Sequence, residues 1–382
     1  VIDNLEEFVE TYGYWVTKIK KLEEEEEVNT INKEFVKSRK EIIGVIIPNS
    51  VTSIGDGAFK NCSSLKSVII PNSVTSIGAY VFSNCSNLEE IEIPNSVTTI
   101  GDDAFSSCSS LEEIKIPNSV TTIGEYAFAD CINLESVIIP NSVTSIGESA
   151  FNNCSSLESV IIPNSVTTIG EYAFEDCSLE SVIIPNSVTI IDESSFYNCS
   201  SLEEIEIPNS VTSIDDYTFK GCSSLKSVII PDSVTSICKG AFDNCNSLKI
   251  IKRRNIVRSE GNYAFYNCSS VEEIEIPNSV TTIGESAFGR CKNLKSVIIP
   301  NSVTTIGDGV FSFCSSLESV TIPKSIKNIE KIGIPTDIIH NVLPVVEGIK
   351  KPKTGKKPKK PKTGKKPKTG KKSKKPRTGK KP

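Results

Sequence analysis

Hydrophobic and polar positions along the chain follow one pattern that repeats about every 23 residues. One unit, which starts at Leu65, reads LKSVIIPNSVTSIGAYVFSNCSN, with apolar residues at fixed places and a cysteine near its end. A fixed period of this length is typical of a solenoid, in which each repeat forms one coil. The thirteen predicted coils begin at Ile42, Leu65, Leu88, Leu111, Leu134, Leu157, Leu179, Leu202, Leu225, Leu248, Val271, Leu294 and Leu317.

The first half of each unit predicts a short strand that ends in a turn. Val68 and Ile70 alternate with Ser67 and Ile69, which is the period of two expected of a strand with one buried face. Pro71 has no N–H group to donate to a neighbouring strand, so pairing is expected to stop there. The chain is therefore expected to turn directly after each strand.

The second half of the unit has buried positions of its own. Val74 and Ile77 are expected to face inward, and Gly78 suits the next change of direction. Phe82 and Cys85 fall at helical offsets, which predicts a single helical turn. Each inward side chain gains roughly 1.5–3 kcal/mol only when neighbouring coils cover it, so stability must come from stacking.

These residues carry a family resemblance. The unit LxxVxIPxSVTxIGxxAFxxCxxL resembles the leucine-rich repeats of the BspA-like group, which occur in surface proteins of bacteria and parasitic protists. The resemblance covers about residues 42–322. It implies a curved leucine-rich-repeat solenoid of about 13 coils, with a parallel β-sheet on the concave face and short strands, turns and single helical turns elsewhere. Members are often adhesins, but the shared repeat specifies a scaffold and does not identify a ligand.

The flanks differ from the repeats in composition. Residues 1–41 are rich in charge and predict a helical N-terminal cap, with a coiled-coil partner helix as the alternative. Residues 42–322 form the predicted solenoid, and residues 323–349 are expected to cap its other end. Residues 350–382 contain Lys, Pro, Thr and Gly in low-complexity order with no apolar residue to bury, which predicts a disordered basic tail.

Charge separates the tail from the rest of the chain. Residues 350–382 carry eighteen Lys and Arg and no acid, which leaves 24 basic and 47 acidic residues before them, a net charge of −23. The tail is expected to contact a polyanion such as nucleic acid, anionic lipid or an acidic wall polymer, with an affinity that falls as salt rises. The alternative is a tail that only solubilises the protein.

Cysteine occupies one column of the predicted array. Thiols of adjacent coils would lie near enough for a disulfide, but each fills an apolar slot, and buried cysteine behaves as a small hydrophobe. Free, protected thiols are expected, with pairing as the alternative. Cys238 stands at a glycine position and is expected to reach solvent, and no metal site is expected because one column cannot enclose a metal. The column consists of Cys62, Cys85, Cys108, Cys131, Cys154, Cys177, Cys199, Cys222, Cys245, Cys268, Cys291 and Cys314.

The outward strand positions vary between coils and provide the candidate binding site. Some coils place acidic pairs there, as Glu90 with Glu92 and Glu204 with Glu206 do. Three consecutive coils instead supply isoleucine, and a contiguous exposed apolar strip suggests a contact surface. The alternative is that isoleucine favours strands and near-identical copying has preserved it. The outward isoleucines are Ile69, Ile138, Ile161, Ile183, Ile229 and Ile298.

One coil departs from the pattern. Its sequence, LKIIKRRNIVRSEG, places Arg253 and Glu260 at core positions. Buried charges are stable only when they are paired, so an ion pair between the two or a local opening of the coil is expected. Lys252, Arg254 and Arg258 add to Arg253 to make a candidate anion site, and decay of one redundant copy is the alternative.

Composition offers little material for catalysis. With one His and no Met, no catalytic residue and no cofactor are expected, and no apolar stretch reaches the roughly 20 residues of a membrane span. The favoured function is a non-enzymatic protein-recognition scaffold, adhesin-like and secreted or on the cell surface, that binds a host or matrix protein on its concave sheet. The alternative is a cytoplasmic interaction module that its basic tail holds on nucleic acid or anionic membrane.

Overall fold

A computed structural model describes residues 29–33, 36, 41–253, 257–335, 338–339 and 341–343. The chain divides into two units, Val1–Val345 and Val346–Pro382. The predicted tail and most of the predicted N-terminal cap lie outside the described residues, as does His340. Those predictions therefore remain predictions.

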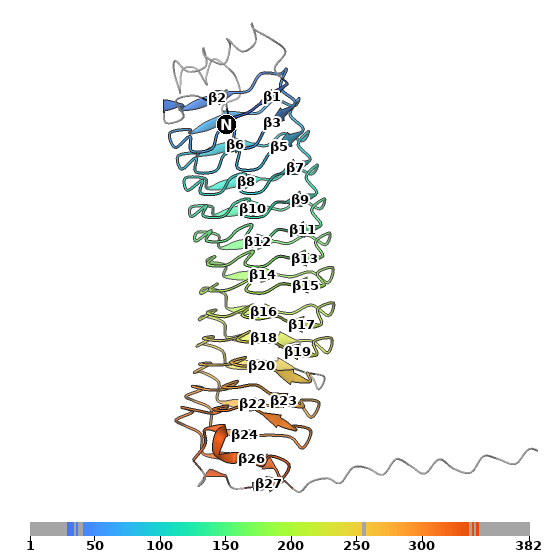
Figure 1. The fold of residues 1–382 in the computed structure, drawn as a ribbon, viewed down its shortest axis with the longest axis vertical. Coiled ribbons are helices and arrows are strands. Elements are labelled where there is room, and N and C mark those ends of the chain that lie inside the picture. Colours follow the sequence, from blue (N-terminus) through green and yellow to red (C-terminus); the bar gives the residue numbers. More distant parts are fainter. Residues whose placement is uncertain are drawn as a thin grey trace, which may run out of the picture. The chain divides into compact units, whose positions relative to one another are not determined.

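A column of short parallel strands runs along the repeats (Figure 1), and we call it the even-strand column. Neighbouring strands pair in register, so equivalent residues of adjacent coils are Cα partners. They form three sheets, β2 to β6, β8 to β20, and β22 to β26 with β27 (Asn341–Leu343). The column consists of β2 (Gly44–Ile46), β4 (Ser67–Ile69), β6 (Glu90–Glu92), β8 (Glu113–Lys115), β10 (Ser136–Ile138), β12 (Ser159–Ile161), β14 (Ser181–Ile183), β16 (Glu204–Glu206), β18 (Ser227–Ile230), β20 (Ile250–Arg253), β22 (Glu273–Glu275), β24 (Ser296–Ile298) and β26 (Ser319–Pro323).

A second column of two-residue strands, the odd-strand column, alternates with the first along the chain. Its strands are also parallel and form one sheet from β1 to β15 and another from β17 to β25. The strand β1 lies inside the range predicted as a cap and pairs with β3. The column consists of β1 (Thr30–Ile31), β3 (Ser53–Ile54), β5 (Ser76–Ile77), β7 (Thr99–Ile100), β9 (Thr122–Ile123), β11 (Ser145–Ile146), β13 (Thr168–Ile169), β15 (Ile190–Ile191), β17 (Ser213–Ile214), β19 (Ser236–Ile237), β21 (Ser259–Glu260), β23 (Thr282–Ile283) and β25 (Thr305–Ile306).

The segment predicted as a helical turn is a run of tight turns instead. Tyr80 and Asn84 have φ values of 59° and 60°, in the left-handed region that a right-handed helix excludes. The N–H groups of Tyr80, Phe82 and Asn84 donate to carbonyls of the next coil at 2.7–2.8 Å. A single helical turn would fix several dihedrals for one hydrogen bond, whereas these bonds recur from coil to coil. The 3₁₀ helix η2 (Ile329–Ile332) follows the last of the turns.

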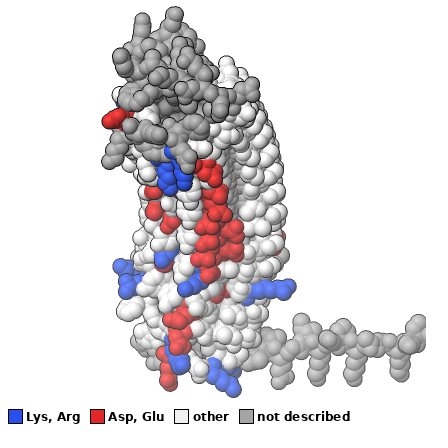
Figure 2. Space-filling model, turned by 45° about the horizontal axis from the view of Figure 1, so that its top comes forward, with Lys and Arg blue, Asp and Glu red and all other residues white. Residues whose placement is uncertain are grey.

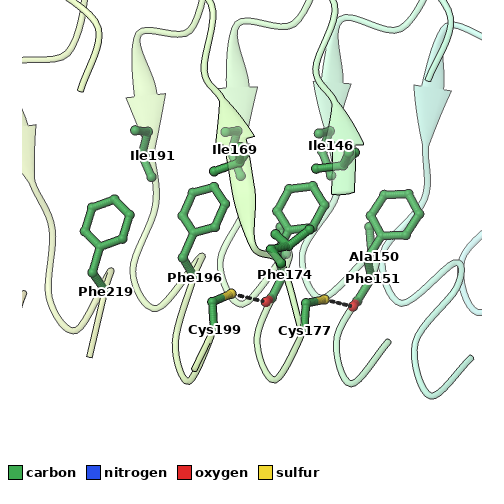
Figure 3. Close-up of a cluster of buried hydrophobic side chains, with 14 of the residues drawn as sticks. Ile146, Ala150, Phe151, Ile169, Phe174, Cys177, Ile191, Phe196, Cys199 and Phe219 are labelled. Atoms are coloured by element: carbon green, nitrogen blue, oxygen red, sulfur yellow. Dashed lines mark hydrogen bonds between the residues drawn. The ribbon is translucent and has the colours of Figure 1, made fainter. Parts of the chain in front are cut away.

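Twelve phenylalanines form a continuous stack through the interior, and Figure 3 shows the part from Phe151 to Phe219. From Phe59 to Phe311, consecutive ring centroids lie 5.2–5.7 Å apart and the rings are nearly parallel. The inward strand positions predicted from the alternation are buried as well, at Val68 and Ile70 among others. The core is therefore a set of parallel columns, one for each inward position of the repeat.

The cysteine column lies beside this stack, and all thirteen cysteines of the chain are free. The expectation of unpaired thiols agrees with this arrangement and remains a prediction for thiol counting to test. Each thiol of the column from Cys85 onward donates to a phenylalanine carbonyl of the preceding coil, as Cys177 Sγ does to Phe151 at 3.1 Å (Figure 3). Burial raises the pKa of the column thiols from Cys108 onward and brings it to about 12 for Cys131 and for Cys314. Cys314 and Cys238 are only partly buried.

Thiol counting tests this packing. Because the thiolate is the reactive form and burial raises each pKa, native protein at pH 8 should label slowly at no more than two sites, Cys238 and Cys314. Protein unfolded without reductant should label at all thirteen cysteines. A low count in the unfolded protein would mean that the column forms disulfides.

The odd-strand column is interrupted where side chains replace a column of glycines. A Cβ on Gly147 would lie 2.7 Å from the carbonyl oxygen of Ile123, closer than real contacts allow, so glycine permits the close approach of coils there. Asp192 and Asp215 occupy this column, and pairing stops between their coils, at β15 and β17. A side chain in this column does not by itself end pairing, because Cys238 also stands there and its strand β19 pairs with both β17 and β21. Burial, and secondarily the charge of Asp215, raises the pKa of Asp192.

The raised pKa of Asp192 predicts a stability effect with a definite sign. Its ionised form is disfavoured in the folded protein, so the cost is present at neutral pH and disappears as pH falls below the ordinary aspartate range. Asp192→Asn keeps the Cβ and removes the charge. It should raise the thermal midpoint at pH 7, on the order of 1 °C, and leave it unchanged near pH 3.

Glu112→Gln, on an exposed residue of the even-strand side, is the control for net charge. A midpoint for Asp192→Asn that is equal to or below that of the parent protein at pH 7 would contradict the argument.

Candidate functional site

Three outward isoleucines form a strip on β10, β12 and β14. Ile138, Ile161 and Ile183 have exposed fractions of 64%, 79% and 81%, and they are Cα partners in adjacent strands. The valine that precedes each of them is buried in the core. We call these three residues the isoleucine strip. The strip is apolar, faces solvent and is held by paired strands on a packed interior.

The remaining predicted outward residues lie elsewhere on the even-strand column. Ile298 and Ile229 are exposed by 61% and 40%, each next to strands without an exposed isoleucine at that position. Ile69 is only partly exposed, and Ser67 on the same face of β4 is buried, so the predicted binding role of Ile69 remains a prediction. The acidic residues of the other coils are exposed as expected, at Glu90, Glu92, Glu204 and Glu206.

A row of glutamates borders the isoleucine strip, with a row of serines between the two. Each member of the row stands directly before an even strand, and all are exposed. Figure 2 shows acidic side chains gathered in a column along one face, with basic side chains near its ends. We call this set the glutamate row, and it consists of Glu89, Glu112, Glu135, Glu158, Glu180 and Glu203.

Lysines neutralise only the two ends of the glutamate row. Lys66 Nζ lies 2.9 Å from Glu89 Oε1, and Lys226 Nζ lies 2.6 Å from Glu203 Oε1. Among the described residues, no Lys or Arg pairs with the four glutamates between them. The sequence analysis did not predict this row, although the sequence contains its signal, a glutamate directly before each of six successive strands.

The candidate anion site is divided in the structure. Lys252 lies in β20 as the partner of Ile229, whereas Arg258 directly precedes β21 of the other column; both are exposed. Glu260 is 1% exposed, as its core position predicts. The structure does not describe the side chain of Arg253, and Arg254 lies outside the described residues. The predicted ion pair and the anion site remain predictions.

The turns between the columns contain a hollow of about 350 Å³ that sequence reasoning did not single out. Tyr172, Tyr197, Tyr217 and Lys220 help to line it. Lys220 Nζ lies 5.6 Å and 5.0 Å from the ring centroids of Tyr197 and Tyr217 and 3.4 Å from Asp243 Oδ2. The aromatic faces are therefore already engaged by a cation of the same chain.

Within the part of the chain that the structure describes, no group of three or more His, Cys, Asp or Glu residues could hold a metal ion. The same residues include no helix that is both long and apolar enough to cross a bilayer.

Parallel coils with ladders of Leu, Ile, Phe and Cys define a leucine-rich-repeat solenoid. The chain belongs to the BspA-type leucine-rich repeat family, since the family described as "BspA type Leucine rich repeat region (6 copies)" matches residues 29–155, 121–249 and 212–332. The resemblance of the repeat unit to this family is thereby confirmed. Proteins of this type commonly mediate protein–protein interaction or adhesion.

Solved structures agree with this assignment. A leucine-rich repeat protein from Bacteroides ovatus is 31% identical over 82% of this chain and 87% of its own, with a TM-score of 0.68. A leucine-rich repeat protein from Eubacterium ventriosum (24% identity, 82% and 88% covered, TM-score 0.54) shares the fold. So does the pneumococcal vaccine antigen PcpA (22% identity, 78% and 73% covered, TM-score 0.51). No curated protein matches the chain.

Proposed function

We propose that this protein is a non-enzymatic scaffold that recognises a protein partner through the isoleucine strip. The observation that carries the proposal is the exposure of three in-register isoleucines on adjacent strands. Covering such side chains gains up to roughly 1.5–3 kcal/mol each, so a complementary surface would bind there.

The surroundings of the strip suit an interface. An apolar centre excludes water, and the glutamate row beside it supplies a charged rim that selects the orientation and charge of the partner. The backbone of the strip is fixed by pairing on both sides, because β12 is hydrogen-bonded to β10 and to β14. Binding would therefore cost little ordering of the scaffold.

The favoured setting is the cell surface or the secreted space, where an adhesin-like scaffold would meet a host or matrix protein. The repeat family supports this reading, since BspA-type repeats resemble those of surface proteins. The basic composition of residues 350–382 favours the alternative, a cytoplasmic module held on nucleic acid or anionic membrane.

The triple change Ile138→Glu, Ile161→Glu and Ile183→Glu tests the binding surface. It leaves the inward columns intact, so circular dichroism should be unchanged. Capture of protein partners, compared by affinity purification followed by quantitative mass spectrometry, should weaken by at least ~2 kcal/mol, about thirtyfold.

A matched control adds the same three charges to the same coils on the exposed threonines directly before the odd strands, as Thr144→Glu, Thr167→Glu and Thr189→Glu. This control should bind like the parent protein. Equal capture by the parent protein and the isoleucine variant would rule out the strip as the binding surface.

Polyanion binding by the tail has its own test. Removing residues 350–382 should abolish retention on heparin at low salt, and the affinity of the full chain should fall steeply as salt rises, because bound cations release condensed counterions. Retention that survives the truncation would place the site on the rest of the chain. Lys252 and Arg258 would then be the first residues to change.

A further inference from the structure

We propose that the partner contributes an amphipathic α-helix with one basic flank, which lies along the stack of coils over the isoleucine strip. This inference rests on the proposed function and specifies the chemistry of the partner at that site. It follows from three features of the even-strand column: the spacing of the strip, the charge on one side of it and the neutrality of the other side.

The spacing of the coils is closer to the pitch of a helix than to the repeat of an extended chain. The strands of the strip are paired neighbours, so its isoleucines recur about 4.7–4.9 Å apart along the stack. In the interior of the same coils, consecutive phenylalanine centroids lie 5.4 and 5.5 Å apart. An α-helix rises 5.4 Å per turn, so residues at i, i+4 and i+7 present one side chain to each successive coil. Side chains on one face of an extended strand recur at roughly 6.6–6.8 Å and fall out of step with the coils.

The glutamate row specifies the charge of one helix flank. Glu135, Glu158 and Glu180 belong to the same three coils as the isoleucine strip and are exposed beside it. Like charges one coil apart repel one another, and cations on a bound helix would relieve that repulsion. Lys66 and Lys226 pair with the glutamates at the two ends of the row, so the segment left for a partner's cations covers the three coils of the strip and the coil of Glu112 before them.

Among the described residues of these three coils, the positions on the other side of the strip carry no charge, and the exposed Lys115, the Cα partner of Ile138, lies at the end of the strip. Ile139 and Ile162, which follow the first two strands, are buried, and the prolines and asparagines after them are uncharged. A helix on the strip therefore meets an acidic side and a neutral side. This asymmetry favours Lys or Arg on one flank of the helix only. It thereby selects one of the two directions in which the helix can run along the stack of coils.

A second copy of this chain fits the surface less well. It would bring another body with a net charge of −23 over residues 1–349 against the same acidic row. Charge complementarity thus favours a basic partner over self-association.

The test selects ligands without bias. A phage-displayed library of random linear peptides is panned on the full chain, with counter-selection on the Ile138→Glu, Ile161→Glu, Ile183→Glu variant. The enriched peptides should show apolar residues at i, i+3 or i+4, and i+7, with Lys or Arg along one flank. They should become helical on binding, as circular dichroism would show.

Variants of the glutamate row then test the flank. Glu135→Gln, Glu158→Gln and Glu180→Gln together should weaken the enriched peptide at least about tenfold at low salt and flatten its salt dependence. The control changes three glutamates of the turns, Glu148→Gln, Glu171→Gln and Glu193→Gln, and should leave the affinity unchanged.

Four results would overturn the inference. The first two are enriched peptides with the alternating pattern of an extended strand and enriched peptides that are neutral or acidic. The third is a lack of enrichment over the counter-selected background. The fourth is an affinity of the enriched peptide that the glutamate variants leave unchanged. A dimer in sedimentation that the isoleucine variant abolishes would assign the strip to a second copy instead. The capture experiment tests the proposed function separately. If the isoleucine variant loses its protein partner but the enriched peptides are not helical, only the inference of a helical partner is rejected, and the proposed function stands.

Discussion

In-register stacking of coils is the constraint on which the rest of the structure depends. Each coil has no closed interior of its own, so every inward side chain must meet its own equivalent in the coils on either side. The phenylalanine stack shows the result, with ring centroids 5.2–5.7 Å apart along twelve coils. The thiol-to-carbonyl bonds and the turn hydrogen bonds repeat at the same step. Near-identity of the repeats is thus a packing requirement, because a substitution in one coil is felt by two others.

This requirement differs between columns of the repeat. Strand pairing stops between the coils of Asp192 and Asp215, at β15 and β17, whereas the coil of Cys238, which stands in the same glycine column, stays paired on both sides. The phenylalanine column is kept throughout, and it carries the stack past this break, since Phe196 and Phe219 remain 5.5 Å apart. Interior packing and sheet hydrogen bonding are therefore partly independent, and a lapse in one column need not interrupt the solenoid.

The period of the sequence was sufficient to predict the strands, their inward residues and the free thiols, because these depend on equivalence between coils. It was insufficient for the turns. The helical offsets of Phe82 and Cys85 predict a local helix, whereas the observed segment is hydrogen-bonded to the next coil and contains residues in the left-handed region. The isoleucine strip could be predicted from alternation alone. The extent of the glutamate row and its lysine ends could not, because they become apparent only when the residue before each strand is compared across paired coils.

The same register that builds the core also builds the surface. Any outward position becomes a row of side chains one coil apart, so a short run of similar repeats creates a surface of one chemical kind. Where isoleucine recurs over three coils, that surface is apolar; where glutamate recurs over six, it is acidic. A partner that binds such rows must offer side chains at a similar interval along one direction, and the turns of a helix come closer to the spacing of the strands than the side chains on one face of an extended segment do. Recognition by this scaffold would thus depend on which outward residues neighbouring coils share, and a change in one coil would shorten a row without disturbing the columns inside.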